Sequence, residues 1–272
     1  MKKIISIIVV FFTLVSITLA QPSTALFKQV MQLSGQMETL FDQGPEALDQ
    51  LVMVAKMSNP SLTDEEAKSK MQEYLKSQFF DDITALSLPY YTSLTDADCE
   101  VLIKSLGAEE MQDVMKRITA SSAKSQSQMS VNISSSMQQV MTGATPEAIA
   151  YNEAPASLVK KFHEYADLIG LEATMDGALN SVKQQMTALL PDNMKEQMEK
   201  TLQVAFDYLR GNIRPMTFNL MSETVTEQDL QRYIDLFSTP AGQHMVEGNK
   251  ALSNDVVNFS MQYMRKMVEY MK

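Results

Sequence analysis

The side chains able to do metal or acid–base chemistry are few and scattered. The chain holds two histidines, His163 and His244, and neither has a second histidine or a cysteine at the spacing of a zinc site. Asp81, Asp82 and Glu164 are candidates for a carboxylate-based site, but no motif joins them. No Gly-x-Ser-x-Gly elbow and no phosphate-binding glycine loop occurs. The sequence therefore predicts no catalytic residue, no metal site and no cofactor, with a carboxylate-based enzyme as the alternative.

Methionine is the unusual component of the composition, with 22 residues in the chain. Four of them lie along the last predicted helix at spacings of three and four residues: Met261, Met264, Met267 and Met271. Thioether side chains fill gaps in cores, form adaptable apolar binding surfaces and bind Cu(I). The pattern favours core packing, and it leaves open an interaction face for a protein or a small apolar ligand, and a Cu(I) carrier.

Two short segments, 95–106 and 226–237, begin with the same signal for a helix start. Each opens with a Thr-x-x-Asp capping box, made by Thr95 and Asp98 in the first segment and by Thr226 and Asp229 in the second. Each then places apolar side chains at i, i+3, i+4 and i+7, so that one face of the helix is buried. Cys99 occupies the place that Leu230 takes in the other segment, which predicts a small buried hydrophobic side chain rather than a reactive thiol.

The similarity between the two halves extends upstream of these segments. Residues 27–35 resemble residues 162–170, and a proline precedes each capped helix, Pro89 in the first half and Pro215 in the second. Self-similarity of this kind within one chain is typical of a duplicated structural unit. The sequence therefore predicts two related multi-helix units.

The second capped segment leads into Phe237-Ser-Thr-Pro-Ala-Gly242. This stretch resembles a bacterial family catalogued as domain of unknown function twenty fifty-nine, in which an acidic capped helix is followed by an aromatic residue, Ser-Pro-x-Gly and a long terminal helix. Phe237, Ser238, Pro240 and Gly242 match that pattern, with Thr239 inserted. The resemblance covers roughly residues 156–272. It implies an exported α-helical domain, and it brings no catalytic residues with it.

The same motif has a structural explanation. Ser238 or Thr239 is suited to cap the last helix, and Pro240 fits a first helical turn because its missing N–H has no partner there. Gly242 lets the preceding helix approach closely through Phe237. A glycine that helps to bind an anion is the alternative interpretation.

The first twenty residues have the composition of a secretory signal. Lys2 and Lys3 precede an apolar run, and small residues come just before Gln21, which predicts cleavage after Ala20 and a periplasmic or secreted protein. No later stretch of the sequence has the roughly 20 apolar residues that span a bilayer. Removal of the two lysines changes the formal net charge from −10 to −12. An acidic chain of this kind argues against nucleic acid as a partner.

The remaining composition predicts an all-α helical bundle. Residues with high helix propensity dominate, glycine is scarce, and prolines fall where helices begin. We expect an N-terminal helical unit at 21–120, a Ser/Gln-rich connection at 121–155 and a C-terminal helical domain at 156–272. The helices are expected at 24–42, 45–57, 63–87, 95–106, 108–120, 156–189, 191–211, 213–223, 226–237 and 239–271. The function favoured by the sequence is a binding or interaction module, with the oligomeric state and the partner left open.

Overall fold

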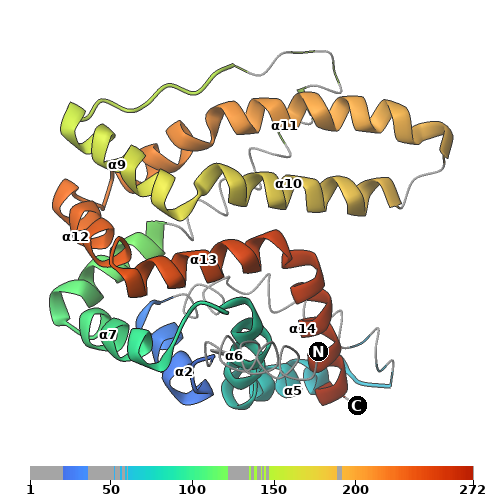
Figure 1. The fold of residues 1–272 in the computed structure, drawn as a ribbon. Coiled ribbons are helices and arrows are strands. Elements are labelled where there is room, and N and C mark those ends of the chain that lie inside the picture. Colours follow the sequence, from blue (N-terminus) through green and yellow to red (C-terminus); the bar gives the residue numbers. More distant parts are fainter. Residues whose placement is uncertain are drawn as a thin grey trace, which may run out of the picture.

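The computed structural model describes residues 21–35, 61–121, 147–188 and 192–271, together with a few isolated positions. Over this part of the chain the backbone forms α-helices and one short 3₁₀ helix and no strand, which confirms the all-α prediction (Figure 1). None of the described helices combines the length and apolar character needed to cross a bilayer. The predicted signal peptide at 1–20, the predicted helix at 45–57 and most of the connection at 121–155 lie outside the described residues.

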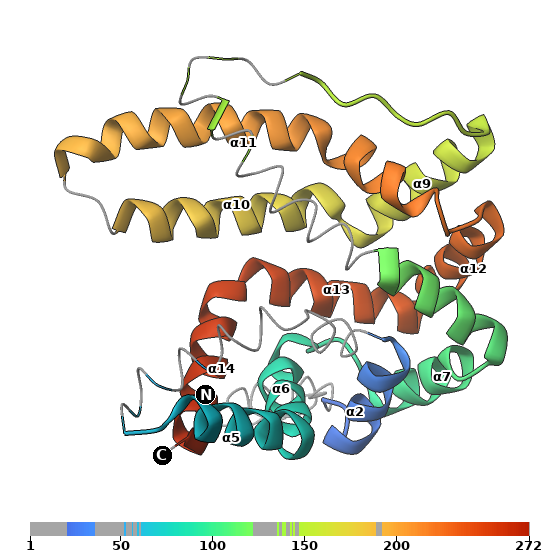
Figure 2. The ribbon, with the colours of Figure 1, turned by 180° about the vertical axis from the view of Figure 1, so that it is seen from behind.

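The helices form two groups on either side of α13 (Figures 1 and 2). On one side, α10 and α11 make a long antiparallel hairpin. On the other side lie α2, α5, α6 and α7, while α9 and α12 lie at one end of the molecule and α14 at the other. The bounds are α2 (Thr24–Leu33), α5 (Asp64–Ser77), α6 (Phe79–Ser87), η1 (Leu88–Tyr90), α7 (Asp96–Leu106), a helix at 109–121, α9 (Ala156–Ile169), α10 (Leu171–Ala188), α11 (Asp192–Met221), α12 (Glu227–Phe237), α13 (Pro240–Asn254) and α14 (Val256–Met271).

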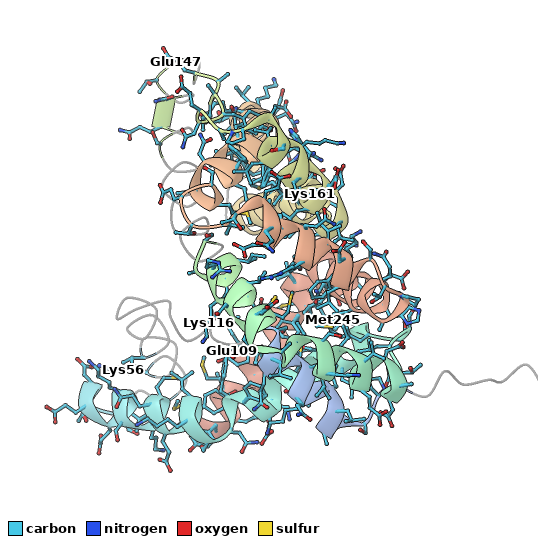
Figure 3. The ribbon with its side chains drawn as sticks, turned by 90° about the vertical axis from the view of Figure 1, so that its left-hand side faces the viewer. Lys56, Glu109, Lys116, Glu147, Lys161 and Met245 are labelled. Atoms are coloured by element: carbon cyan, nitrogen blue, oxygen red, sulfur yellow. The ribbon has the colours of Figure 1, made fainter. Side chains whose placement is uncertain are left out.

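The main hydrophobic core joins both halves of the chain. It collects buried side chains from α2, α5, α6, α7, α9, α12, α13 and α14, and Met245, labelled in Figure 3, is fully buried within it. A second, smaller core lies inside the α10–α11 hairpin, and Leu171 packs against both cores. Over the described residues, the two predicted halves therefore contribute side chains to one shared core.

Three helices predicted as continuous are interrupted. The predicted helix 63–87 breaks at Gln78, and 156–189 breaks at Gly170, which has a φ of 65° and ends α9 in the left-handed conformation. The predicted helix 239–271 ends at Asp255, whose carboxylate accepts a hydrogen bond from the Tyr90 hydroxyl at 2.7 Å. Tyr90 lies far from Asp255 in the sequence, and the helical pattern of 239–271 did not reveal this break.

The opposite correction applies to α11, which was predicted as separate helices at 191–211 and 213–223. It runs unbroken from Asp192 to Met221 with Pro215 inside it. A proline inside a helix removes one hydrogen bond and crowds the carbonyl four residues earlier. That carbonyl belongs to Gly211, an exposed residue where an added Cβ would meet nothing within 4 Å, so the carbonyl lies on the solvent side of the helix.

Candidate functional site

A cavity of about 360 Å³ lies where the two halves of the chain meet. This volume falls at the lower end of the range that small-molecule sites occupy, about 300–1,000 Å³. None of the described residues that line it carries a charged side chain. The lining residues are Ser34, Gly35, Met115, Ile118, Thr119, Tyr165, Ile169, Thr174, Tyr233, Phe237, Val246, Asn249, Leu252 and Ser253.

Two of the residues that line the cavity are tyrosines that are almost completely buried. Tyr165 on α9 is 4% exposed and Tyr233 on α12 is 8% exposed. Their ring centroids are 5.1 Å apart with the planes at 73°, and the Tyr233 ring stacks on Phe237 at 4.3 Å. Edge-to-face and stacked pairs of this kind hold each ring in place. The two tyrosine rings that line the cavity are therefore held in fixed positions.

Burial raises the pKa of both phenols above the ordinary value for tyrosine. The pKa of Tyr233 is raised further by the nearness of Tyr165, because ionisation of one phenol would oppose ionisation of the other. Both hydroxyls are therefore protonated at neutral pH and able to donate a hydrogen bond.

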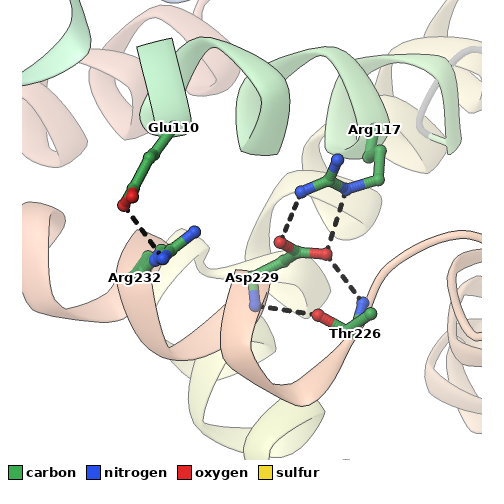
Figure 4. A network of polar contacts seen from close by, with 5 residues as sticks. All are labelled: Glu110, Arg117, Thr226, Asp229 and Arg232. Carbon is green, nitrogen blue, oxygen red and sulfur yellow. Dashed lines mark hydrogen bonds and ion pairs between the residues drawn. The ribbon is translucent and has the colours of Figure 1, made fainter. Parts of the chain in front are cut away.

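The wall made by the 109–121 helix is fastened to α12 by an ion-pair network (Figure 4). Arg117 donates to both carboxylate oxygens of Asp229, from Nε at 3.0 Å and from Nη2 at 2.6 Å, and Arg232 pairs with Glu110 at 2.9 Å. Partial burial raises the pKa of the Asp229 carboxyl group, because it disfavours the ionised form. Hydrogen bonds from Arg117 and Thr226 outweigh this effect and lower the pKa below the ordinary value. The network fixes the 109–121 helix beside α12, and Met115, Ile118 and Tyr233 from these two helices all line the cavity.

A second contact between the halves involves the aspartate of the other capping box. His244 Nδ1 on α13 lies 3.0 Å from a carboxylate oxygen of Asp98 on α7. Partial burial opposes ionisation of Asp98, yet hydrogen bonds from His244 and Thr95 lower its pKa. Both predicted capping boxes form, since Thr95 and Thr226 each accept the backbone N–H of the aspartate three residues later. Each capping aspartate thus binds its own helix start and a side chain of the other half.

The motif at the start of α13 adopts the predicted helix start, and Thr239 is the residue that caps it. Its hydroxyl accepts the N–H of Gly242 at 3.1 Å, and Pro240 occupies the first turn, while Ser238 ends α12. A Cβ at Gly242 would lie 2.4 Å from the Cα of Phe237. Gly242 is therefore needed for close packing of α12 on α13, and its N–H is already bonded, which weakens the anion-binding alternative.

The four methionines of α14 do not lie on one exposed face. Met267 and Met271 are fully buried in the main core, whereas Met261 is 46% and Met264 is 42% exposed. A spacing of three residues falls short of a full helical turn by about 60°, so two such steps rotate Met267 by about 120° from Met261. Part of the stripe is core and part is surface.

The candidate carboxylates take separate partners. Asp82 is mostly buried on α6 and accepts a hydrogen bond from the Tyr74 hydroxyl at 3.0 Å, while Asp81 pairs with Lys28. Glu164 on α9 pairs with Lys161 at 2.6 Å. The described contacts do not gather the three carboxylates into one site.

The other predicted residues have plain surroundings. Cys99 is fully buried, and burial raises the pKa of its thiol to about 12. His163 contacts Arg214 at 3.0 Å within a cluster of charged side chains on α9, α10 and α11. The sequence analysis did not single out Tyr165 or the role of Tyr233 in a site. Their only signal, an aromatic residue on an apolar helix face, is the same as that of ordinary core residues.

The fold and the cavity place this chain among all-α proteins with a small-molecule-sized pocket at a helix interface. The family model DUF2059, described as an uncharacterized protein conserved in bacteria, matches residues 212–269. The C-terminal part of the chain therefore carries a DUF2059 domain, over a shorter range than the 156–272 expected from the motif. No curated protein and no solved structure matches the chain. The matched range contains α12, α13 and most of α14, and with them Tyr233, Phe237 and Val246 of the cavity wall.

Proposed function

We propose that this protein binds a small, mainly apolar molecule in the cavity between its two halves. The observation that carries the proposal is a cavity of ligand size with an uncharged, largely apolar lining that includes two buried phenols. The lining comes from the end of α2, the 109–121 helix, α9, α10, α12 and α13, so that binding depends on the complete fold. A carrier or sensor of an apolar molecule agrees with the absence of a catalytic motif in the sequence.

A fluorescence titration with the neutral apolar dye N-phenyl-naphthylamine tests this function. Val246 is buried on the cavity wall, and Val246→Trp fills part of the space that the dye would occupy. Val204 is an exposed valine on α11 and provides the matched control Val204→Trp. We expect saturable binding by the wild-type protein and the control, and loss of binding by the cavity variant.

The titration contradicts the proposal if the wild-type protein shows no saturable binding or if Val246→Trp binds as well as wild type. Circular dichroism establishes that each variant is helical before it is titrated. Should Val246→Trp not fold, Ile118→Phe fills the opposite wall of the cavity with a smaller increase in volume.

A second candidate function is attachment of a partner protein through α14. The observation that favours it is the exposure of Met261 and Met264, which lie one turn apart on the outer side of this helix. A pull-down with the mature chain and with Met264→Glu tests it. Identical sets of bound proteins for the two baits would exclude this surface.

We also infer that the chain contains two copies of one helical unit. The supporting pairs are α2 with α9, α7 with α12, and the 109–121 helix with α13. The separation in sequence between the starts of the paired helices is the same for the last two pairs. Gly35 and Gly170, equivalent in the sequence comparison, both have positive φ, and α2 packs on α7 as α9 packs on α12. An alignment of homologues in which the two capping boxes vary independently in type and spacing would argue against the duplication.

Export remains part of the proposal and rests on the composition of residues 1–20. The expected mature protein begins at Gln21 and is recovered from the periplasm or the medium. Mass spectrometry of the protein recovered from fractionated cells measures this directly. A full-length mass in the cytoplasmic fraction would disprove export.

A further inference from the structure

The hydroxyl groups of the two cavity tyrosines have no hydrogen-bond partner among the residues that the structure describes. Neither Tyr165 nor Tyr233 makes a side-chain hydrogen bond to a described residue, although both side chains are more than nine-tenths buried. Within the described part of the chain, the fully enclosed polar side-chain atom that lacks a partner is Ser87 Oγ, not a tyrosine hydroxyl. Each phenol oxygen therefore keeps a small accessible surface, and the cavity is a space that both residues line.

Unpaired hydrogen-bond donors in a buried site indicate which chemical group a ligand should present to them. A buried polar group without a hydrogen bond is costly, so a ligand gains most by presenting an acceptor to it. The two phenols are held by their aromatic contacts with each other and with Phe237, and they do not have to reorganise when an acceptor arrives. Water satisfies such donors in the free protein and is displaced by the ligand.

The charge of the ligand follows from the rest of the wall. The described lining residues include no lysine, arginine, aspartate or glutamate. An ionised group would lose part of its hydration against this wall with no opposite charge beside it, which is unfavourable. An uncharged acceptor such as a carbonyl oxygen meets the two donors without that cost.

We propose that the ligand of this cavity is an uncharged, mainly apolar molecule with a carbonyl-type oxygen that accepts hydrogen bonds from Tyr165 and Tyr233. The apolar body packs against side chains such as Ile118, Val246 and Leu252. This assignment rests on the proposed binding function and adds the chemical class of the ligand and the residues that recognise it.

Two dyes of similar size separate the acceptor from the apolar body. Prodan is a neutral naphthyl ketone whose emission shifts to the red when its carbonyl accepts hydrogen bonds, and N-phenyl-naphthylamine lacks a carbonyl. Both are titrated into wild type, Tyr165→Phe, Tyr233→Phe and the control Tyr208→Phe, which alters a tyrosine packed against the second core. These substitutions keep the ring and remove only the hydroxyl, so the fold is retained.

Loss of one hydrogen bond is expected to weaken Prodan binding by roughly threefold to tenfold in each cavity variant. Its bound emission should also shift to the blue, while binding of N-phenyl-naphthylamine is unchanged or improved and Tyr208→Phe resembles wild type. If both dyes bind wild type but Prodan affinity and emission are the same in both cavity variants, the acceptor assignment is wrong and the binding function stands. If neither dye binds wild type, the binding function itself fails.

Discussion

Gly242→Ala tests whether the close approach of α12 and α13 is required for stability. The added Cβ would lie 2.4 Å from the carbonyl oxygen of Leu236 and 2.4 Å from the Cα of Phe237. Both atoms belong to the backbone, so a rotamer change of a side chain cannot relieve the clash. The end of α12 must move away from α13, and the cavity wall formed by Phe237 moves with it.

The magnitude follows from two opposing effects. Overpacking of this kind costs about 1–3 kcal/mol, and a clash with backbone belongs at the upper end of that range. Alanine in place of glycine inside a helix returns about 1 kcal/mol through helix propensity. The net expected loss is about 2 kcal/mol, which corresponds to a decrease in Tm of about 4–8 °C for a chain of this size.

Thermal and urea unfolding followed by circular dichroism measure this loss. Gly211→Ala is the matched control because it makes the same chemical change on α11, where an added Cβ meets nothing within 4 Å. The control should be as stable as wild type or more stable. Equal stability of Gly242→Ala and Gly211→Ala would refute the explanation of the Ser-Thr-Pro-x-Gly motif as a packing motif.

Two further substitutions follow from the contacts. Asp229→Ala removes a helix cap and the partner of Arg117, at an expected cost of about 1–3 kcal/mol against a negligible cost for the exposed Asp235→Ala. The pKa of Asp229 is lowered in the fold, so its contribution to the free energy of unfolding is full above about pH 4 and is lost as the pH falls through the folded value. In urea unfolding at stepped pH, the stability of wild type should therefore approach that of Asp229→Ala in acid. Met264→Glu should change the free energy of unfolding by less than about 0.5 kcal/mol, whereas Met267→Glu should lower it by more than about 3 kcal/mol, because only the second substitution buries a charge. Similar losses for the two variants in urea unfolding would contradict the assignment of Met264 to the surface and of Met267 to the core.

The sequence alone predicted those features that depend on residues close together in the chain. The capping boxes at Thr95 and Thr226 and the start of α13 at Pro240 form as expected, because a cap needs only a side chain and a backbone N–H three residues away. The burial of Cys99 followed from its place on a periodic apolar face. The duplication, export and binding function are predictions of the same origin that the structure has not tested.

Tertiary structure decided the features that depend on which segments meet. The break between α13 and α14 at Asp255, which Tyr90 contacts, was not predicted, and the methionines of α14 divide between core and surface according to the helices that cover them. The cavity is lined by side chains from segments far apart in the sequence, among them Tyr165 on α9 and Tyr233 on α12, whose rings are in contact, and Ile118 of the 109–121 helix. The apolar residues of a helix face have the same spacing in the sequence whether the neighbouring helices fill the space against that face or leave room for a ligand. Only the packing of distant helices settles that difference, because burial and cavity volume are properties of the assembled chain.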